Sequence, residues 1–135
     1  YAERDPEVRV ALRAFLRDAS DRVVVSTVVL HELLVGAGDR RGRAAIERAV
    51  LTPFARRLRV VETTAAVWRD AAQIVRALRA AGGYTASLDR PSFERDILIA
   101  ASARSVGATL VTANARDFAI IAEVYAFRYA TALPG

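Results

Sequence analysis

The chain is 135 residues long, which fits one domain with enough interior to form its own core. Hydrophobic residues make up 53% of it, so it does not have the composition of a disordered region. The absence of cysteine excludes disulfides and thiolate metal sites, and a single histidine excludes a histidine cluster. Any bound metal must therefore be held mainly by carboxylates, which favours a hard cation such as Mg²⁺ or Mn²⁺.

The formal net charge is +5, and every basic residue is an arginine. Such a surface attracts phosphate backbones, although bulk charge alone is a weak indicator of nucleic-acid binding. The longest apolar stretch, residues 23–35, is interrupted by polar side chains and is too short to span a membrane. No signal peptide is evident. We therefore expect a cytoplasmic protein without a membrane partner.

The first half of the chain alternates predicted helices and strands. Residues 6–19 have apolar side chains at helical spacing, which predicts an amphipathic helix. Residues 22–26 are apolar on both faces, as is typical of a buried parallel strand. A helix over 27–37 follows, with Ser26 or Thr27 as its cap. A basic helix over 40–51, stopped by Thr52-Pro53, and a strand over 58–62 come next.

The second half continues this alternation. Thr63 or Thr64 is expected to cap a long helix that reaches about Ala81 and ends at Gly82-Gly83. Residues 84–91 are predicted as a loop and 92–105 as a nearly all-apolar helix. A strand over 109–113, a turn into a short helix or loop at 114–118 and a last strand over 125–129 complete the pattern.

Strands that alternate with helices indicate an α/β fold with a central parallel sheet flanked by helices. The chain opens at Tyr1 with a predicted helix, and it contains no methionine. That first helix lacks the strand from which it should cross over. We therefore expect residues 1–135 to form a single domain whose N-terminal strand lies upstream of Tyr1.

Three acidic residues interrupt apolar segments near predicted strand–helix junctions: Glu32, Asp96 and Asp117. Ligands of open α/β sheets bind at the carboxyl ends of the strands, where these side chains could converge. Converging carboxylates repel one another, and a divalent cation removes that repulsion. Such a cation also activates water and neutralises charge on a phosphate, which is the chemistry of a metal-dependent nuclease.

Each of these acids also has a purely structural interpretation. Asp96 could stabilise a helix N-terminus, Glu32 could pair with an arginine, and Asp117 could cap the helix that follows its turn. The occurrence of all three, each in the same kind of apolar setting, favours a shared site.

Three segments resemble the successive acidic motifs of PIN domains, most closely those of VapC-type toxins. They are STVVLHEL at 26–33, DILIAASA at 96–103 and TLVTANARDF at 109–118. The resemblance covers essentially the whole chain. It implies a four-acid site, Mg²⁺- or Mn²⁺-dependent RNA cleavage, a small antitoxin partner and a homodimer.

By this resemblance Glu32, Asp96 and Asp117 take three of the acidic positions, and Thr112 and Asn114 support the site. The family's first acid belongs to an Asp-Thr-Asn/Ser motif that does not occur here. Asp5 is a poor substitute, because it precedes a proline and no strand leads to it. The expected fourth acid therefore lies on the upstream strand. Arg95 also departs from the asparagine that the family often has beside the acid.

We interpret the chain as a metal-dependent endoribonuclease, the toxin of a toxin–antitoxin pair. The leading alternative is a catalytically silent PIN module that binds RNA or a protein without cutting. A second alternative, a nucleotide-binding α/β protein, lacks support, since no glycine-rich phosphate loop follows any strand. We expect His31 to be a packed or surface residue rather than a catalytic one. We expect Trp68 and the aromatic residues Tyr125, Phe127 and Tyr129 to be core or interface residues rather than base-stacking ones.

Overall fold

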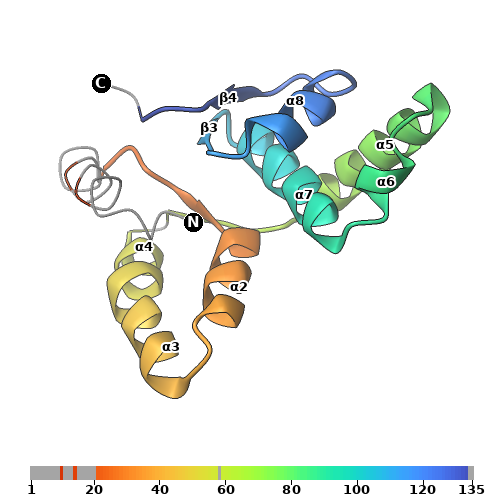
Figure 1. Ribbon diagram of the computed structural model, residues 1–135. Coiled ribbons are helices and arrows are strands. Elements are labelled where there is room, and N and C mark those ends of the chain that lie inside the picture. Colours follow the sequence, from red (N-terminus) through yellow and green to blue (C-terminus); the bar gives the residue numbers. More distant parts are fainter. Residues whose placement is uncertain (1–9, 11–13, 15–20, 58, 134–135) are drawn as a thin grey trace.

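The computed structural model describes residues 10, 14, 21–57 and 59–133 (Figure 1). Most of the described residues are helical, and four short strands lie between the helices. The helix predicted over 6–19 falls outside the described residues, except that Val10 and Ala14 are helical. No helix in the described part of the chain is long and apolar enough to cross a membrane.

The first strand pair brings together two segments that are separated in the chain by the helices of residues 27–56, the helical arm. Strand β1 (Val25–Ser26) runs parallel to β2 (Val60–Val61). Helix α2 (Thr27–Gly36) starts directly after β1, and the Ser26 hydroxyl accepts a hydrogen bond of 3.2 Å from the Val29 N–H. Ser26 therefore caps the helix as predicted, because it satisfies a backbone donor that has no partner within the helix.

The predicted helix end at Thr52-Pro53 is wrong. Helix α3 (Arg40–Ile46) continues through a single π-helical segment, η1 (Glu47–Leu51), into α4 (Thr52–Arg56). The wider turn is closed by the Thr52 N–H, which donates to the Glu47 carbonyl oxygen. Pro53 follows this wider turn and lies inside a continuous helical stretch, since the residues before it are already helical. The helical arm consequently runs past the proline.

The second strand pair consists of β3 (Thr109–Val111) and β4 (Arg128–Ala130), which are also parallel. Helix α8 (Ala115–Ala122) connects them. The α/β fold with parallel strands is thus confirmed. Within the described residues, however, the strands form two separate pairs, and β1 does not pair with β3. The observed strands are also shorter than the predicted ones, and β4 starts three residues later than expected.

The core lies between two long helices, α5 (Ala65–Ala81) and α7 (Pro91–Ser105), with α8 packed against α7 (Figure 1). Helix α5 begins after the Thr64 cap and buries one face at helical spacing: Val67, Ala71, Ile74 and Leu78. Helix α7 contributes Phe93 and Ile97, and α8 contributes Phe118 and Ile121, all at most 2% exposed. Burial of each large side chain contributes about 2 kcal/mol, which fixes α7 and α8 against each other.

The segment predicted as a loop over 84–91 contains a short helix, α6 (Thr85–Leu88). It leads into α7, whose first residue is Pro91. The aromatic residues Tyr125, Phe127 and Tyr129 are partly buried and pack against the core, which agrees with a packing role. The Tyr125 hydroxyl donates to Asp70 Oδ2 at 2.6 Å and so ties this segment to α5.

Candidate functional site

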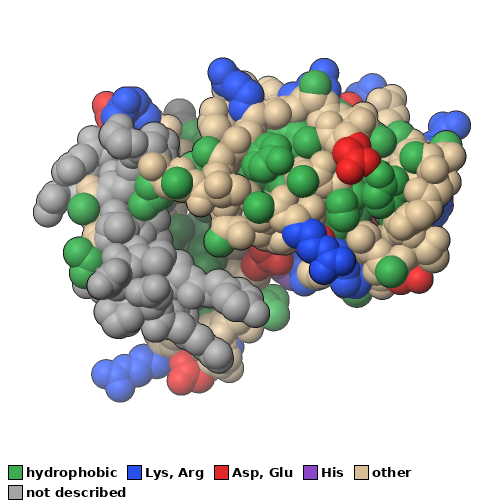
Figure 2. All heavy atoms as spheres, turned by 45° about the horizontal axis from the view of Figure 1, so that its top comes forward, with side chains coloured by type: hydrophobic (Ala, Val, Ile, Leu, Met, Phe, Trp, Pro, Cys, Tyr) green, Lys and Arg blue, Asp and Glu red, His purple; other side chains and the backbone are tan. Residues whose placement is uncertain are grey.

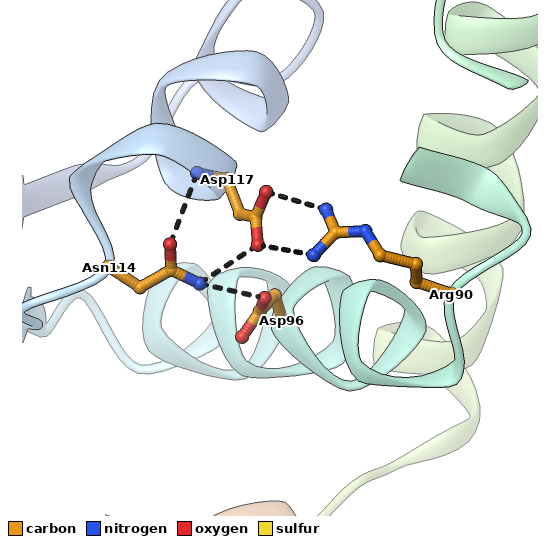
Figure 3. A network of polar contacts seen from close by, with 4 residues as sticks. All are labelled: Arg90, Asp96, Asn114 and Asp117. Atoms are coloured by element: carbon orange, nitrogen blue, oxygen red, sulfur yellow. Dashed lines mark hydrogen bonds and ion pairs between the residues drawn. The ribbon is translucent and has the colours of Figure 1, made fainter. Parts of the chain in front are cut away.

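Four of the predicted site residues lie where α7, α8 and the loop after β3 come together. Asp96 is in the second turn of α7, and Asp117 is in the first turn of α8. Thr112 and Asn114 lie in the short connection between β3 and α8. Because α7 and α8 are held together by the core below them, their polar residues are brought into contact (Figure 3).

Asn114 links the two carboxylates. Its Nδ2 donates to Asp96 Oδ2 at 3.2 Å and to Asp117 Oδ2 at 3.0 Å (Figure 3). Its Oδ1 accepts from the Asp117 N–H at 3.4 Å, so the same side chain caps α8. The Thr112 hydroxyl in turn accepts from the Asn114 N–H at 3.0 Å. These contacts fix the direction in which both acids point.

Arg90 is a site residue that the sequence analysis missed. It immediately precedes α7, and its Nη2 and Nη1 donate to Asp117 Oδ1 and Oδ2 at 2.7 and 3.1 Å (Figure 3). The Asp117 residue is only 5% exposed, and a buried carboxylate requires a compensating partner. That requirement is the signal that could have prompted a search for an arginine, although it does not say which one.

Glu32 lies to one side of this network. It is on α2, and its Oε1 accepts from Arg95 Nε at 2.7 Å. Both side chains are well exposed, at 40% for Glu32 and 36% for Arg95. The pairing with an arginine that sequence alone left open for Glu32 therefore occurs, at the surface. His31, the neighbour of Glu32, is exposed as expected.

The two linked acids differ in their proton affinity. The pKa of Asp96 is raised to about 6, first by burial and then by the negative charges of Asp117 and Glu32, against the opposing effect of Arg90 and Arg95. The pKa of Asp117 is lowered, chiefly by its hydrogen bonds from Arg90, with a further contribution from Asn114. Asp96 is thus the acid whose charge is least compensated by its surroundings.

The acids do not form a complete metal-binding group by themselves. Among the residues that the structure describes, no set of three or more histidine, aspartate or glutamate side chains is close enough to hold a metal ion. Asp96 and Asp117 meet at one amide nitrogen, whereas Glu32 is engaged by Arg95. The donor chemistry of the linked pair, two carboxylates in a partly buried setting, still suits a hard divalent cation. The metal-binding set of Glu32, Asp96 and Asp117 stays a prediction.

The chain can now be compared with known proteins. A comparison with curated proteins finds no match. Among solved structures, the fold matches the crystal structure of DNA-bound VapBC from Salmonella typhimurium with a TM-score of 0.64 and 26% sequence identity. This match covers 88% of the present chain and 82% of the other one. The PIN domain family matches residues 1–124, which include every candidate site residue, and the chain belongs to that family.

Proposed function

We propose that this protein is a VapC-type toxin ribonuclease that cleaves RNA with the help of Mg²⁺ or Mn²⁺. The observation that carries this proposal is the pair Asp96 and Asp117, which approach the same side-chain nitrogen from two different helices. PIN domains are generally nucleases, and a pair of converging carboxylates is the feature that a metal-dependent nuclease needs.

Asp96 and Asp117 are the residues that would hold the cation, with Glu32 as a further ligand once it leaves Arg95. A bound divalent cation supplies positive charge for the scissile phosphate and lowers the pKa of a bound water. The protein's own residues prepare for this role. Asn114 and Thr112 keep the two carboxylates in a fixed direction, and burial keeps bulk water away from Asp117.

The same acids support an antitoxin partner. We propose that a small antitoxin inserts an arginine among the carboxylates and so competes with the metal. Asp117 already accepts a two-pronged contact from Arg90, so this carboxylate has the geometry that a guanidinium requires. Similarity to a VapBC structure favours such a partner, and a homodimer belongs to the same proposal.

The direct test is an RNA cleavage assay on the purified protein with Mg²⁺, with Mn²⁺ and with EDTA. We expect cleavage with either metal, none with EDTA, and none for Asp96→Asn, with thermal melts to establish that the variant is folded. Undiminished cleavage by folded Asp96→Asn protein would contradict the assigned site. Growth with and without the neighbouring open reading frame tests the antitoxin separately.

A catalytically silent PIN module is the second candidate. It is favoured by the engagement of Asp117 with Arg90 and of Glu32 with Arg95, which leaves Asp96 as the one acid of the three without an arginine contact among the described residues. RNA binding without cleavage in any of the three conditions would support this alternative.

A further inference from the structure

We propose that Arg90 binds a phosphate of the RNA substrate and positions it beside Asp96 and Asp117. This inference rests on the proposed ribonuclease function. Its basis is the unequal environment of the Arg90–Asp117 pair. The Asp117 side chain is 7% exposed, whereas the Arg90 side chain is 43% exposed. In this ion pair the arginine therefore faces the solvent and the carboxylate faces the interior.

Arg90 is held at this position from two directions. Its guanidinium contacts both carboxylate oxygens of Asp117, and its Cζ lies 5.6 Å from the ring centre of Phe93. Phe93 is fully buried in α7, so the ring is a rigid support. An arginine over an aromatic face is attracted to it by the ring's charge distribution. Arg90 thus has one contact that does not depend on Asp117.

The hydrogen-bonding capacity of Arg90 is only partly used. A guanidinium has five N–H donors, and the two contacts with Asp117 need one donor on each terminal nitrogen. The remaining donors belong to an exposed side chain and can reach an incoming ligand. The donors lie in one plane, and two of them can bond to two oxygens of a phosphate. Arginine binds phosphate through two parallel hydrogen bonds, as it binds a carboxylate.

The position of Arg90 also solves an electrostatic problem of the site. The positive charge of Arg90 acts on both Asp96 and Asp117. A phosphodiester that approaches two carboxylates is repelled by them, and a fixed positive charge at the edge reduces that repulsion. Arg95 is held less firmly than Arg90, because it has one contact and its partner Glu32 is 40% exposed.

Matched arginine variants can isolate this role. The parent is the Asp96→Asn protein, which keeps the RNA intact during the measurement. Arg90→Gln removes both the charge and the two parallel hydrogen-bond donors of the guanidinium. Arg90→Lys keeps the charge but not the paired donors. Arg79→Gln is the control, because Arg79 is an exposed arginine in the last turn of α5 whose side chain makes no hydrogen bond or ion pair with another described residue. The probe is a fluorescein-labelled single-stranded RNA of mixed sequence, followed by fluorescence anisotropy in Mg²⁺.

We expect Arg90→Gln to weaken RNA binding about tenfold and to lower the slope of log affinity against log salt by about 1. Arg90→Lys should retain the slope with a smaller loss of affinity, and Arg79→Gln should change affinity less than about twofold. A lower melting temperature is expected in either case, because Arg90 is the main partner of buried Asp117. An Arg90→Gln protein that keeps the salt slope of its parent would overturn the proposal.

The same experiment separates this inference from the proposed function. Cleavage by the wild-type protein with full RNA affinity after Arg90→Gln overturns the role of Arg90 alone. A wild-type protein that neither binds nor cleaves RNA overturns both. A loss for Arg79→Gln as large as that for Arg90→Gln also overturns the proposal, because the effect would then be one of total charge.

Discussion

Two arginine–carboxylate pairs border Asp96, and they have the same shortest distance but different surroundings. Arg90 contacts Asp117 at 2.7 Å, and Arg95 contacts Glu32 at 2.7 Å. The first pair uses both oxygens of a carboxylate that is 7% exposed. The second has one contact and an acid that is 40% exposed. The distance alone therefore does not reveal what an ion pair contributes.

Burial and number of contacts account for the difference. An exposed pair is weakened by water and salt and by the cost of ordering two long side chains, so it adds little stability. A buried carboxylate that loses its partner keeps the penalty of burial. We infer that the Arg90–Asp117 pair is a fixed part of the site and that Glu32 can exchange Arg95 for another ligand at low cost.

Figure 2 places this contrast in the context of the surface. On the face shown there, arginine side chains lie around the edge of a central apolar area and do not form one continuous block. On this face, therefore, the arginines do not form a single basic patch. The predictions below test whether the two pairs differ as described.

The largest expected effect is that of Asp96→Asn. We expect loss of RNA cleavage by about 1000-fold or more, since a neutral amide is a poor ligand for a hard cation. The same substitution should stabilise the fold by about 1–2 kcal/mol, because it removes a charge whose pKa is raised to about 6. Thermal melts and cleavage assays check both. A less stable, inactive variant would show that Asp96 has a structural role.

The second prediction is a pH dependence that separates Asp96 from Asp117. The folded-state pKa of Asp96 is about 6, above the ordinary aspartate value of 3.8. Its contribution therefore destabilises the fold above pH 6, and this cost disappears as the pH falls towards 3.8. Asp117 has a lowered pKa, so its stabilising contribution persists to lower pH and is lost only in stronger acid.

Protons should also compete with a cation at Asp96. Below pH 6 the carboxyl is mostly protonated, so the apparent affinity for Mn²⁺ should fall about tenfold between pH 7 and pH 5. Isothermal titration calorimetry at both values measures this, with Asp96→Asn as the control. An affinity that does not change over this range would exclude Asp96 as the ligand that controls binding.

The third prediction concerns loss of the Arg90–Asp117 ion pair. Arg90→Ala leaves the Asp117 carboxylate without its main partner, and we expect a decrease in Tm of about 5 °C at pH 7. The double variant Arg90→Ala/Asp117→Asn should recover part of this loss, because the remaining group is neutral. Thermal melts of the wild type, Arg90→Ala, Asp117→Asn and the double variant measure the coupling. No recovery would mean that Arg90 stabilises the fold through Phe93 and not through Asp117.

The sequence predicts the acids of the site better than their partners. Asp96 and Asp117 stand out because each lies near the start of a helix, directly before an apolar run that the core then fixes in place. Asn114 and Thr112 are close to Asp117 in the chain, so the local motif includes them. Arg90 lies 27 residues from Asp117, and it is one of many arginines. Only the three-dimensional packing selects it.

The fold was predictable to a similar extent. Caps and apolar spacing locate α2, α5 and α7, because these signals are local. The continuation through Pro53 was not predicted, since it depends on a π-helical turn for which the sequence has no clear signal. The pairing of strands into two separate pairs likewise depends on contacts between segments far apart in the chain.

The smallest expected effect is that of Arg95→Ala, which breaks the exposed pair. Glu32 and Arg95 are 63 residues apart and are joined by one contact, in which the side chains are 40% and 36% exposed. Such a pair adds little to stability, so we expect Tm to change by about 1 °C at most, and less still at 0.5 M NaCl. Arg76→Ala on α5 is the matched control, since Arg76 is also an exposed arginine on a helix. If Glu32 is free to join the cation, Arg95→Ala should leave Mn²⁺ affinity unchanged or slightly increase it. A Tm loss as large as that of Arg90→Ala would contradict the distinction between the two pairs, and a weaker Mn²⁺ affinity would mean that Arg95 holds Glu32 in its working position.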